Sequence, residues 1–162
     1  MKSCTINYRG KFLFLFTFIF FYSAAVATQL SGTYTIDASG TASSTLFKNF
    51  SSAITYLTSA NTRSDGGPSN SSPFGVSGPV VFTVAAATYI EQVEVTAITG
   101  ASATNTVTFD GGAGNAATRI LQYAATSTTD GHTLRFNSCS YITFQNLTIQ
   151  NTGTSQGLAV HF

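Results

Sequence analysis

The side chains that could carry chemistry in this sequence are few and widely spaced. The two histidines, His132 and His161, are 29 positions apart, which is not a metal-ligand spacing. Glu91 and Glu94 stand three residues apart, so on a strand they point to opposite faces, and we expect structural roles in a turn rather than an acid–base pair. No serine lies in a Gly-x-Ser-x-Gly elbow. We therefore expect no metal and no other cofactor.

Three further side chains are candidates for binding: Arg135, His161 and Asp110. Arg135 and His161 each occupy the middle of a short strand pattern that ends in phenylalanine, and Asp110 lies in the turn after an equivalent strand. The segment 110–115 is similar to a calcium-binding Gly-Gly-x-Gly-x-Asp turn, but it occurs once and lacks the final aspartate. We interpret it as an ordinary turn. One arginine and one aspartate do not make a catalytic set, because catalysis needs a nucleophile and a proton donor within reach.

The N-terminus has the pattern of a signal peptide. Three basic residues and no acidic residue precede an apolar run that starts at Phe12, and Ala25-Val26-Ala27 supplies the small residues that signal peptidase requires. The stretch from Phe12 to Ala27 has 16 residues, whereas a membrane-spanning helix needs roughly 20. We predict that residues 1–27 are removed, and that the mature protein is secreted or displayed at the cell surface without a stable membrane span.

The mature chain is weakly acidic. It contains four basic and six acidic side chains, hence a net charge of −2. The basic residues are scattered along the sequence and do not form the basic patch that binds nucleic acid. Cys139 has no partner for a disulfide after Cys4 leaves with the signal. The sequence therefore predicts one domain without a disulfide, and no nucleic-acid partner.

Glycine and proline divide the mature chain into three zones. Residues 28–60 contain an alternating strand at 30–37 and a helix at about 45–59, for which Ser44 or Thr45 is the expected N-cap. Residues 61–79 contain all three prolines and are expected to form a surface loop. Residues 80–162 contain no proline, which is typical of strands that must donate every ladder hydrogen bond.

The proline-free zone contains an apparent repeat. One strand pattern recurs at steps of 27, 27 and 26 residues, in the segments 80–82, 107–109, 134–136 and 160–162. A second column follows the same step at Val93, Ile120 and Leu147. Such a period predicts an all-β fold, a right-handed parallel β-helix of about three rungs and the start of a fourth. In it the phenylalanines would stack inside, residues 81, 108, 135 and 161 would form an outward column, and the helix would cap the first rung.

An antiparallel sandwich of short strands is the alternative, but its strands need not recur at one period in matching registers. Because the fourth rung stops at Phe162, we expect the β-helix to be truncated there, so that the sequence is a fragment.

Three segments carry a family resemblance, at residues 87–93, 146–152 and 156–160. They resemble the pectin-lyase-like β-helix superfamily, and pectin methylesterases in particular. Residues 87–93 are similar to the family's Gly-x-Tyr-x-Glu-x-Val segment, although Ala87 and Thr88 replace its glycine-led start. Residues 146–152 and 156–160 resemble its Asn-Leu-Thr-x-x-Asn-Thr and Gln-Ala-Val-Ala-Leu blocks. The resemblance implies that Gln156 helps to hold an oxyanion, and that the catalytic aspartates and the substrate-binding arginine lie beyond Phe162.

The same segments equally resemble the N-terminal β-helix of large bacterial surface proteins, which lack the esterase aspartates. Two functions therefore stay open. We favour a non-catalytic module that binds polysaccharide or a cell-surface glycan, or mediates adhesion. The alternative is a carbohydrate-active enzyme of the pectin methylesterase or pectate lyase type whose catalytic residues follow Phe162.

Overall fold

The computed structural model describes residues 29–126, 131–154 and 157–162. The expected signal peptide and Gln156 lie outside these ranges. The described chain is predominantly β, with one α-helix and one short 3-10 helix. In chain order the elements are β1 (Leu30–Ile36), β2 (Leu46–Phe47), α1 (Phe50–Thr58), β3 (Val76–Val84), β4 (Ala87–Ile90), β5 (Val93–Val95), β6 (Val107–Asp110), the 3-10 helix Ala116–Thr118, β7 (Arg119–Tyr123), β8 (His132–Phe136), β9 (Ile142–Gln145), β10 (Thr148–Asn151) and β11 (Leu158–His161).

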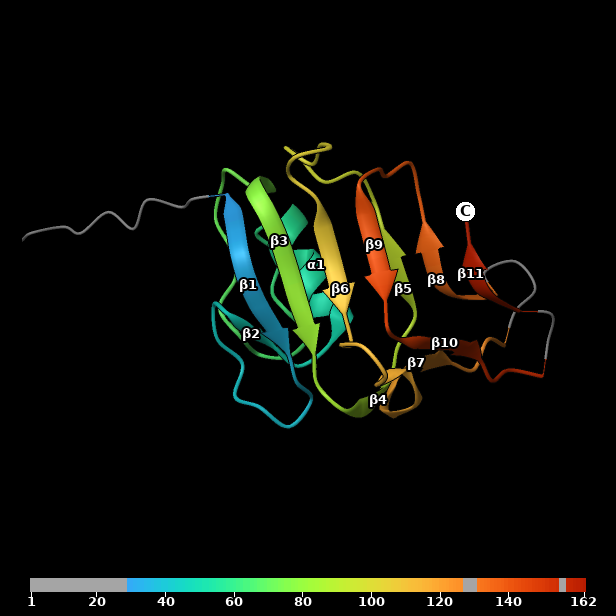
Figure 1. Ribbon diagram of the computed structural model, residues 1–162. Coiled ribbons are helices and arrows are strands. Elements are labelled where there is room, and N and C mark those ends of the chain that lie inside the picture. Colours follow the sequence, from blue (N-terminus) through green and yellow to red (C-terminus); the bar gives the residue numbers. More distant parts are fainter. Residues whose placement is uncertain (1–28, 127–130, 155–156) are drawn as a thin grey trace, which may run out of the picture.

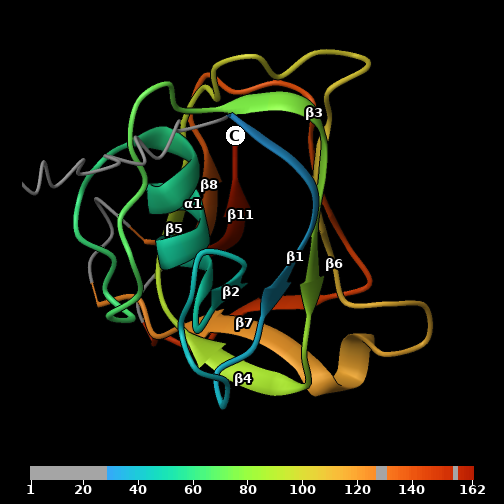
Figure 2. The ribbon, with the colours of Figure 1, turned by 90° about the vertical axis from the view of Figure 1, so that its left-hand side faces the viewer.

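The strands form three parallel sheets. Sheet A has the order β2-β1-β3-β6-β9, sheet B the order β4-β7-β10, and sheet C the order β5-β8-β11. From β3 onward the chain passes through sheets A, B and C in the same sequence three times, so that each turn is laid beside the previous one (Figure 1). Figure 2, turned by 90°, shows the sheets as three sides around a common interior. All strand pairs among the described residues are parallel, which confirms the predicted parallel β-structure and contradicts the antiparallel sandwich.

An aromatic ladder fills the inner side of sheet A. Tyr34, Phe82, Phe109 and Phe144 are register partners on successive strands. Their ring centroids are 5.5, 4.8 and 4.4 Å apart in that order. The side chains of Phe82 and Phe109 are fully buried. Each buried ring contributes roughly 1.5–3 kcal/mol by leaving water, and stacking adds about 0.5–1.5 kcal/mol per pair.

The predicted repeat is right at its first and last steps and wrong at the middle one: Leu134 pairs with Val160 and Arg135 with His161, but β6 does not pair with β8. Phe82 and Phe109 do pair, but the next partner of Phe109 is Phe144, 35 residues further on. Phe136 belongs to sheet C, where its strand pairs with β5 and β11. The second predicted column is wrong as well, because Val93 lies in sheet C and Ile120 in sheet B. Connections of unequal length join the strands, so a constant sequence step does not follow the hydrogen-bonded register.

Helix α1 starts later than its sequence pattern predicted. Residues 46–47 form β2, which pairs with the end of β1, and Asn49 is the N-cap, since its Oδ1 accepts a hydrogen bond from Ser52 N at 2.7 Å. The prediction of Ser44 or Thr45 as N-cap was therefore wrong. Phe50 extends from the helix to the aromatic ladder, with its ring 5.8 Å from that of Phe109. Figure 2 looks at the end of the molecule that carries β1 and β2, and shows α1 there in front of sheet C.

Strand β3 begins at Val76, inside the range expected to be loop, and includes Pro79. Its register against β1 shifts between Leu30 and Gly32, so the strands are irregular beside the proline. A proline without an N–H is tolerated at such a bulge, whereas it would interrupt a regular ladder. The proline-free strand rule therefore holds only from Val80 onward.

The segment before β3 is fixed by a buried cation. The side chains of Arg63 and Asp65 are fully buried and form an ion pair at 2.5 Å. The guanidinium also donates to the carbonyl oxygen of Leu46 at 2.9 Å and lies 4.2 Å from the centroid of the Phe47 ring. Burial alone raises the pKa of Asp65, but hydrogen bonds from Arg63 and from backbone N–H groups outweigh it and lower the net pKa.

At the opposite end, β9, β10 and β11 are the last strands of the three sheets. A cavity of about 340 Å³ opens between them, lined by Leu134, Phe136, Ile142, Thr143, Phe144, Ile149, Val160 and Phe162. The ring of Phe162 stacks on Phe136 with a centroid distance of 5.2 Å. The interior is thus covered by α1 at one end and presents apolar side chains at the other.

The free energy of unfolding of ladder variants distinguishes the observed register from a constant 27-residue repeat. Phe109→Ala removes a fully buried ring and should lower the free energy of unfolding by about 3–5 kcal/mol. Phe136→Ala and Phe74→Ala remove half-buried rings outside the ladder and should cost clearly less. Urea denaturation of the three variants measures this, and equal losses for Phe109 and Phe136 would contradict the register.

A second prediction concerns the Arg63–Asp65 pair. Arg63→Ala leaves the Asp65 carboxylate buried without its cation and should cost about 3–5 kcal/mol. Because the pKa of Asp65 is lowered in the folded state, its contribution is present above the unfolded value of about 4 and is lost as the pH falls through the folded value. The wild-type protein should therefore lose stability on acidification more steeply than Arg63→Ala. Parallel pH profiles of the two proteins would contradict this, and Arg135→Ala provides a control outside the pair.

Candidate functional site

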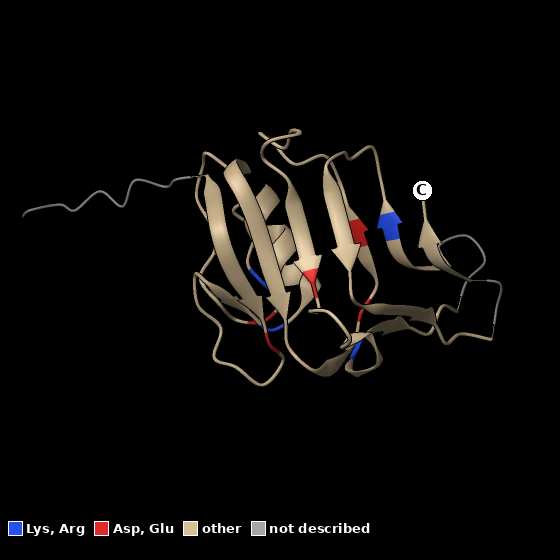
Figure 3. Ribbon diagram, viewed as in Figure 1, with Lys and Arg blue, Asp and Glu red and all other residues tan. Residues whose placement is uncertain are grey.

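The outer face of sheet A carries two columns of mostly polar, uncharged side chains. Thr33, Val81, Thr108 and Thr143 are register partners across four strands, and the next outward column is Thr35, Thr83, Asp110 and Gln145. No other element covers this face in the view of Figure 1. Figure 3 shows it free of Lys, Arg, Asp and Glu except at the end of β6. The face is therefore a broad hydroxyl-rich surface with a single carboxylate at one end.

Asp110, a candidate binding residue from the sequence, stabilises the turn that follows β6. Its Oδ1 accepts hydrogen bonds from Asn146 Nδ2 and from Gly112 N, both at 2.7 Å. These bonds, that from Asn146 first, hold the pKa of Asp110 below its usual range. A Cβ on Gly111 would collide with the carbonyl oxygen of Asn146, so two turns approach at the backbone here. The carboxylate is thus engaged within the protein.

Arg135 and His161 lie side by side on sheet C. They are register partners, and Glu94 is the partner of Arg135 on its other side. The structure therefore brings these two candidates together but places Asp110 on another sheet. The predicted outward column that joined them to Val81 and Thr108 is wrong, because those residues belong to sheet A. Gln156 lies outside the described residues.

Glu91 connects strand β4 to helix α1. Its carboxylate accepts hydrogen bonds from Phe50 N at 2.8 Å, from Ser51 N at 2.9 Å and from Ser51 Oγ at 2.5 Å. Two of the helix N–H groups that lack an intrahelical partner are satisfied in this way, and the negative charge sits at the positive end of the helix dipole. Sequence reasoning missed this contact, since the two segments are about 40 residues apart.

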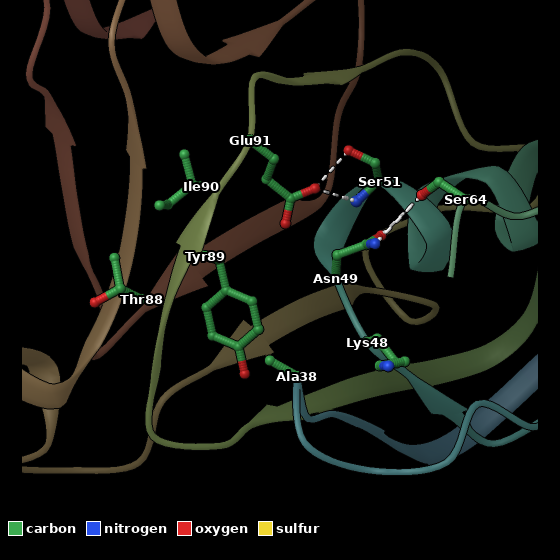
Figure 4. A pocket seen from close by; sticks show the side chains of 9 residues that line it. All are labelled: Ala38, Lys48, Asn49, Ser51, Ser64, Thr88, Tyr89, Ile90 and Glu91. Atoms are coloured by element: carbon green, nitrogen blue, oxygen red, sulfur yellow. Dashed lines mark hydrogen bonds between the residues drawn. The ribbon is translucent and has the colours of Figure 1, made fainter. Parts of the chain in front are cut away.

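A cleft of about 350 Å³ opens between the start of α1 and β4 (Figure 4). Its lining residues are Ala38, Lys48, Asn49, Ser51, Ser64, Thr88, Tyr89, Ile90 and Glu91. Burial raises the pKa of Tyr89 to about 12, and its protonated hydroxyl donates to backbone carbonyls, 3.0 Å from Ala85 O and 3.1 Å from Ile36 O. The side chain of Ile90 is 74% exposed at the edge of the cleft. The cleft thus combines fixed polar groups with an exposed apolar surface, as small-molecule sites do.

No family model matches this chain, and neither a curated protein nor a solved structure is similar to it at a significant level. Within the described ranges, no cluster of His, Cys, Asp and Glu side chains is suited to hold a metal ion. None of the helices described has the length and apolar character to cross a membrane.

The bonds of Glu91 give a third prediction. Glu91→Ala leaves the first N–H groups of α1 without their acceptor and should cost about 1–3 kcal/mol. Glu94→Ala is the matched control, because Glu94 is exposed and faces outward from β5, and it should change stability by no more than about 0.5 kcal/mol. Urea denaturation compares the two variants. Equal stability of both would show that Glu91 does not anchor the helix.

Proposed function

We propose that this chain is a right-handed parallel β-helix module of the cell surface or the secreted fraction, and that it binds a polysaccharide without catalysis. The observation that carries the proposal is the outer face of sheet A, where Thr35 of β1 is in register with Thr83 of β3, and Thr108 of β6 with Thr143 of β9. The regular passage of the chain through three parallel sheets supports a β-helix. The N-terminal pattern of residues 1–27 supports export.

Threonine hydroxyls suit a polyhydroxylated ligand because each can both donate and accept a hydrogen bond. Neighbouring strands repeat every 4.7–4.9 Å, so a sugar chain that crosses the strands meets paired hydroxyls at Thr35 and Thr83 and again at Thr108 and Thr143. The side chains stand on a hydrogen-bonded sheet and are β-branched, so little conformational freedom is lost on binding. The near absence of charge on this face favours a neutral polysaccharide.

The positions of the charged candidates support binding over catalysis. Hydrolysis or elimination requires a base and an acid at one reacting centre. Asp110 is engaged in a turn at the end of sheet A, whereas Arg135 and His161 lie on sheet C. We therefore assign the ligand-binding role to the hydroxyl columns rather than to these residues.

Replacing the hydroxyls tests the proposal. The triple variant Thr33→Val, Thr108→Val and Thr143→Val keeps the β-branched shape and removes three hydrogen-bonding groups from one column. At about 0.5–1.5 kcal/mol per lost bond, affinity for a neutral polysaccharide such as cellulose should fall by about tenfold or more. Depletion isotherms with the insoluble polymer measure this loss.

Thr96→Val, at an exposed threonine that follows β5, is the control and should bind as the wild type does. Unchanged binding by the triple variant would refute the assignment to sheet A. Methanol release from esterified pectin or cleavage of polygalacturonate by the protein would refute the non-catalytic role.

A further inference from the structure

Apolar side chains gather at the end of the molecule that is formed by β9, β10 and β11. Three of the four exposed large apolar side chains among the described residues belong to it, namely Tyr141 at 52%, Leu158 at 53% and Phe162 at 90% exposure. The cavity of about 340 Å³ opens between the same strands. Phe144, the last ring of the ladder, is only half-buried there, whereas Phe109 is fully buried. A cluster of this kind marks an interaction surface.

The backbone of β9 offers unpaired groups at this end. The carbonyl oxygens of Tyr141 and Gln145 accept hydrogen bonds from the side of β6, at 3.0 and 3.1 Å. Because alternate residues of a strand direct their N–H and C=O groups to opposite sides, those of Ile142 and Phe144 point away from β6. No strand of the described chain pairs with β9 on that side. An edge of this kind is a template for pairing with another strand.

The charge of this end favours a second copy as the partner. Residues 136–162, which include β9, β10 and β11, contain no Lys, Arg, Asp or Glu. Natural proteins commonly place charged side chains on an edge strand to prevent pairing between copies. Since these strands carry none, two copies can meet here without like-charge repulsion. A partner selected by charge complementarity would find no charged group on them to recognise.

The opposite end of the coil is covered, so copies cannot stack head to tail. Helix α1 lies over the interior there (Figure 2), with Leu57 fully buried and the ring of Phe50 5.8 Å from that of Phe109. The open end of one molecule therefore finds no free edge at the covered end of the next. Two open ends can meet only about a two-fold axis, which closes the assembly as a dimer instead of a filament.

We propose that the open end is an interface between two copies of this chain, joined end to end. The two-fold axis makes β9 antiparallel to its equivalent in the other copy, so the free N–H and C=O groups of Ile142 and Phe144 exchange hydrogen bonds across it. Leu158 and Phe162 leave water in the same contact. The interface uses strand edges and interior side chains, and it does not depend on polysaccharide binding by the outer face of sheet A.

Sedimentation velocity of the full chain over a range of concentrations tests the interface, and we expect a dimer. Leu158→Lys places one positive charge from each copy in the contact and should weaken the dimer by about a hundredfold or more. Ile90→Lys is the matched control, because it changes an apolar side chain that is 74% exposed on β4, the first strand of sheet B. It should dimerise as the wild type does.

Amide hydrogen exchange gives a second measurement. The N–H groups of Ile142 and Phe144 should exchange slowly in the wild type and rapidly in Leu158→Lys, because only the second copy protects them. The N–H of Phe109, in the middle of sheet A, should stay protected in both proteins, which shows that the variant remains folded.

A monomeric wild type, or a dimer that Leu158→Lys leaves unchanged, would overturn the proposal. A dimer that Ile90→Lys weakens equally would place the contact elsewhere and overturn it too. A monomer in which the Ile142 and Phe144 amides are protected would mean that the edge is covered within the chain, with the same consequence. All variants carry the apolar run that starts at Phe12, so association through that run would persist in Leu158→Lys and would count against the proposal.

Discussion

The stacking of aromatic rings inside sheet A is the interaction on which the rest of the structure depends. Phe109 lies between Phe82 and Phe144, at centroid distances of 4.8 and 4.4 Å. Since successive side chains of a strand point to opposite faces, fixing these rings inward fixes their neighbours outward. A slip of one residue would bring the polar columns into the core. Helix α1 joins the same cluster through Phe50, so the ladder also positions the cleft.

The polar face of sheet A and the cleft between α1 and β4 both follow from that arrangement. The hydroxyl columns are the outward residues that alternate with the ladder on sheet A. The cleft forms where Glu91, at the end of β4, accepts the first N–H groups of α1. The contacts that stabilise the fold, namely burial of the aromatic rings and hydrogen bonding of the first N–H groups of α1, therefore also position these surfaces.

The sequence predicted the parallel β-structure and the helix, because proline-free apolar alternation and helical spacing are local signals. It predicted the register of β3 with β6 and of β8 with β11. It did not predict the register of β6 with β9, since Phe136 and Phe144 satisfy the same alternation and only tertiary pairing decides which of them follows Phe109. The candidate pair Arg135 and His161 came together because both lie in sheet C. The cleft could not be predicted, because it joins Lys48 to Ile90 through a contact between α1 and Glu91 that no sequence spacing encodes.

Disulfide trapping tests the register most directly. With Cys4 and Cys139 replaced by serine, Thr108→Cys and Thr143→Cys place two thiols on neighbouring strands in register, within the Cα separation of about 4.4–6.8 Å that a disulfide accepts. Mild oxidation should link this pair within one chain, as shown by the disulfide-linked peptide after proteolysis. The pair Thr108→Cys and Arg135→Cys joins residues of sheets A and C and should stay reduced. Linkage of the second pair and not the first would contradict the account.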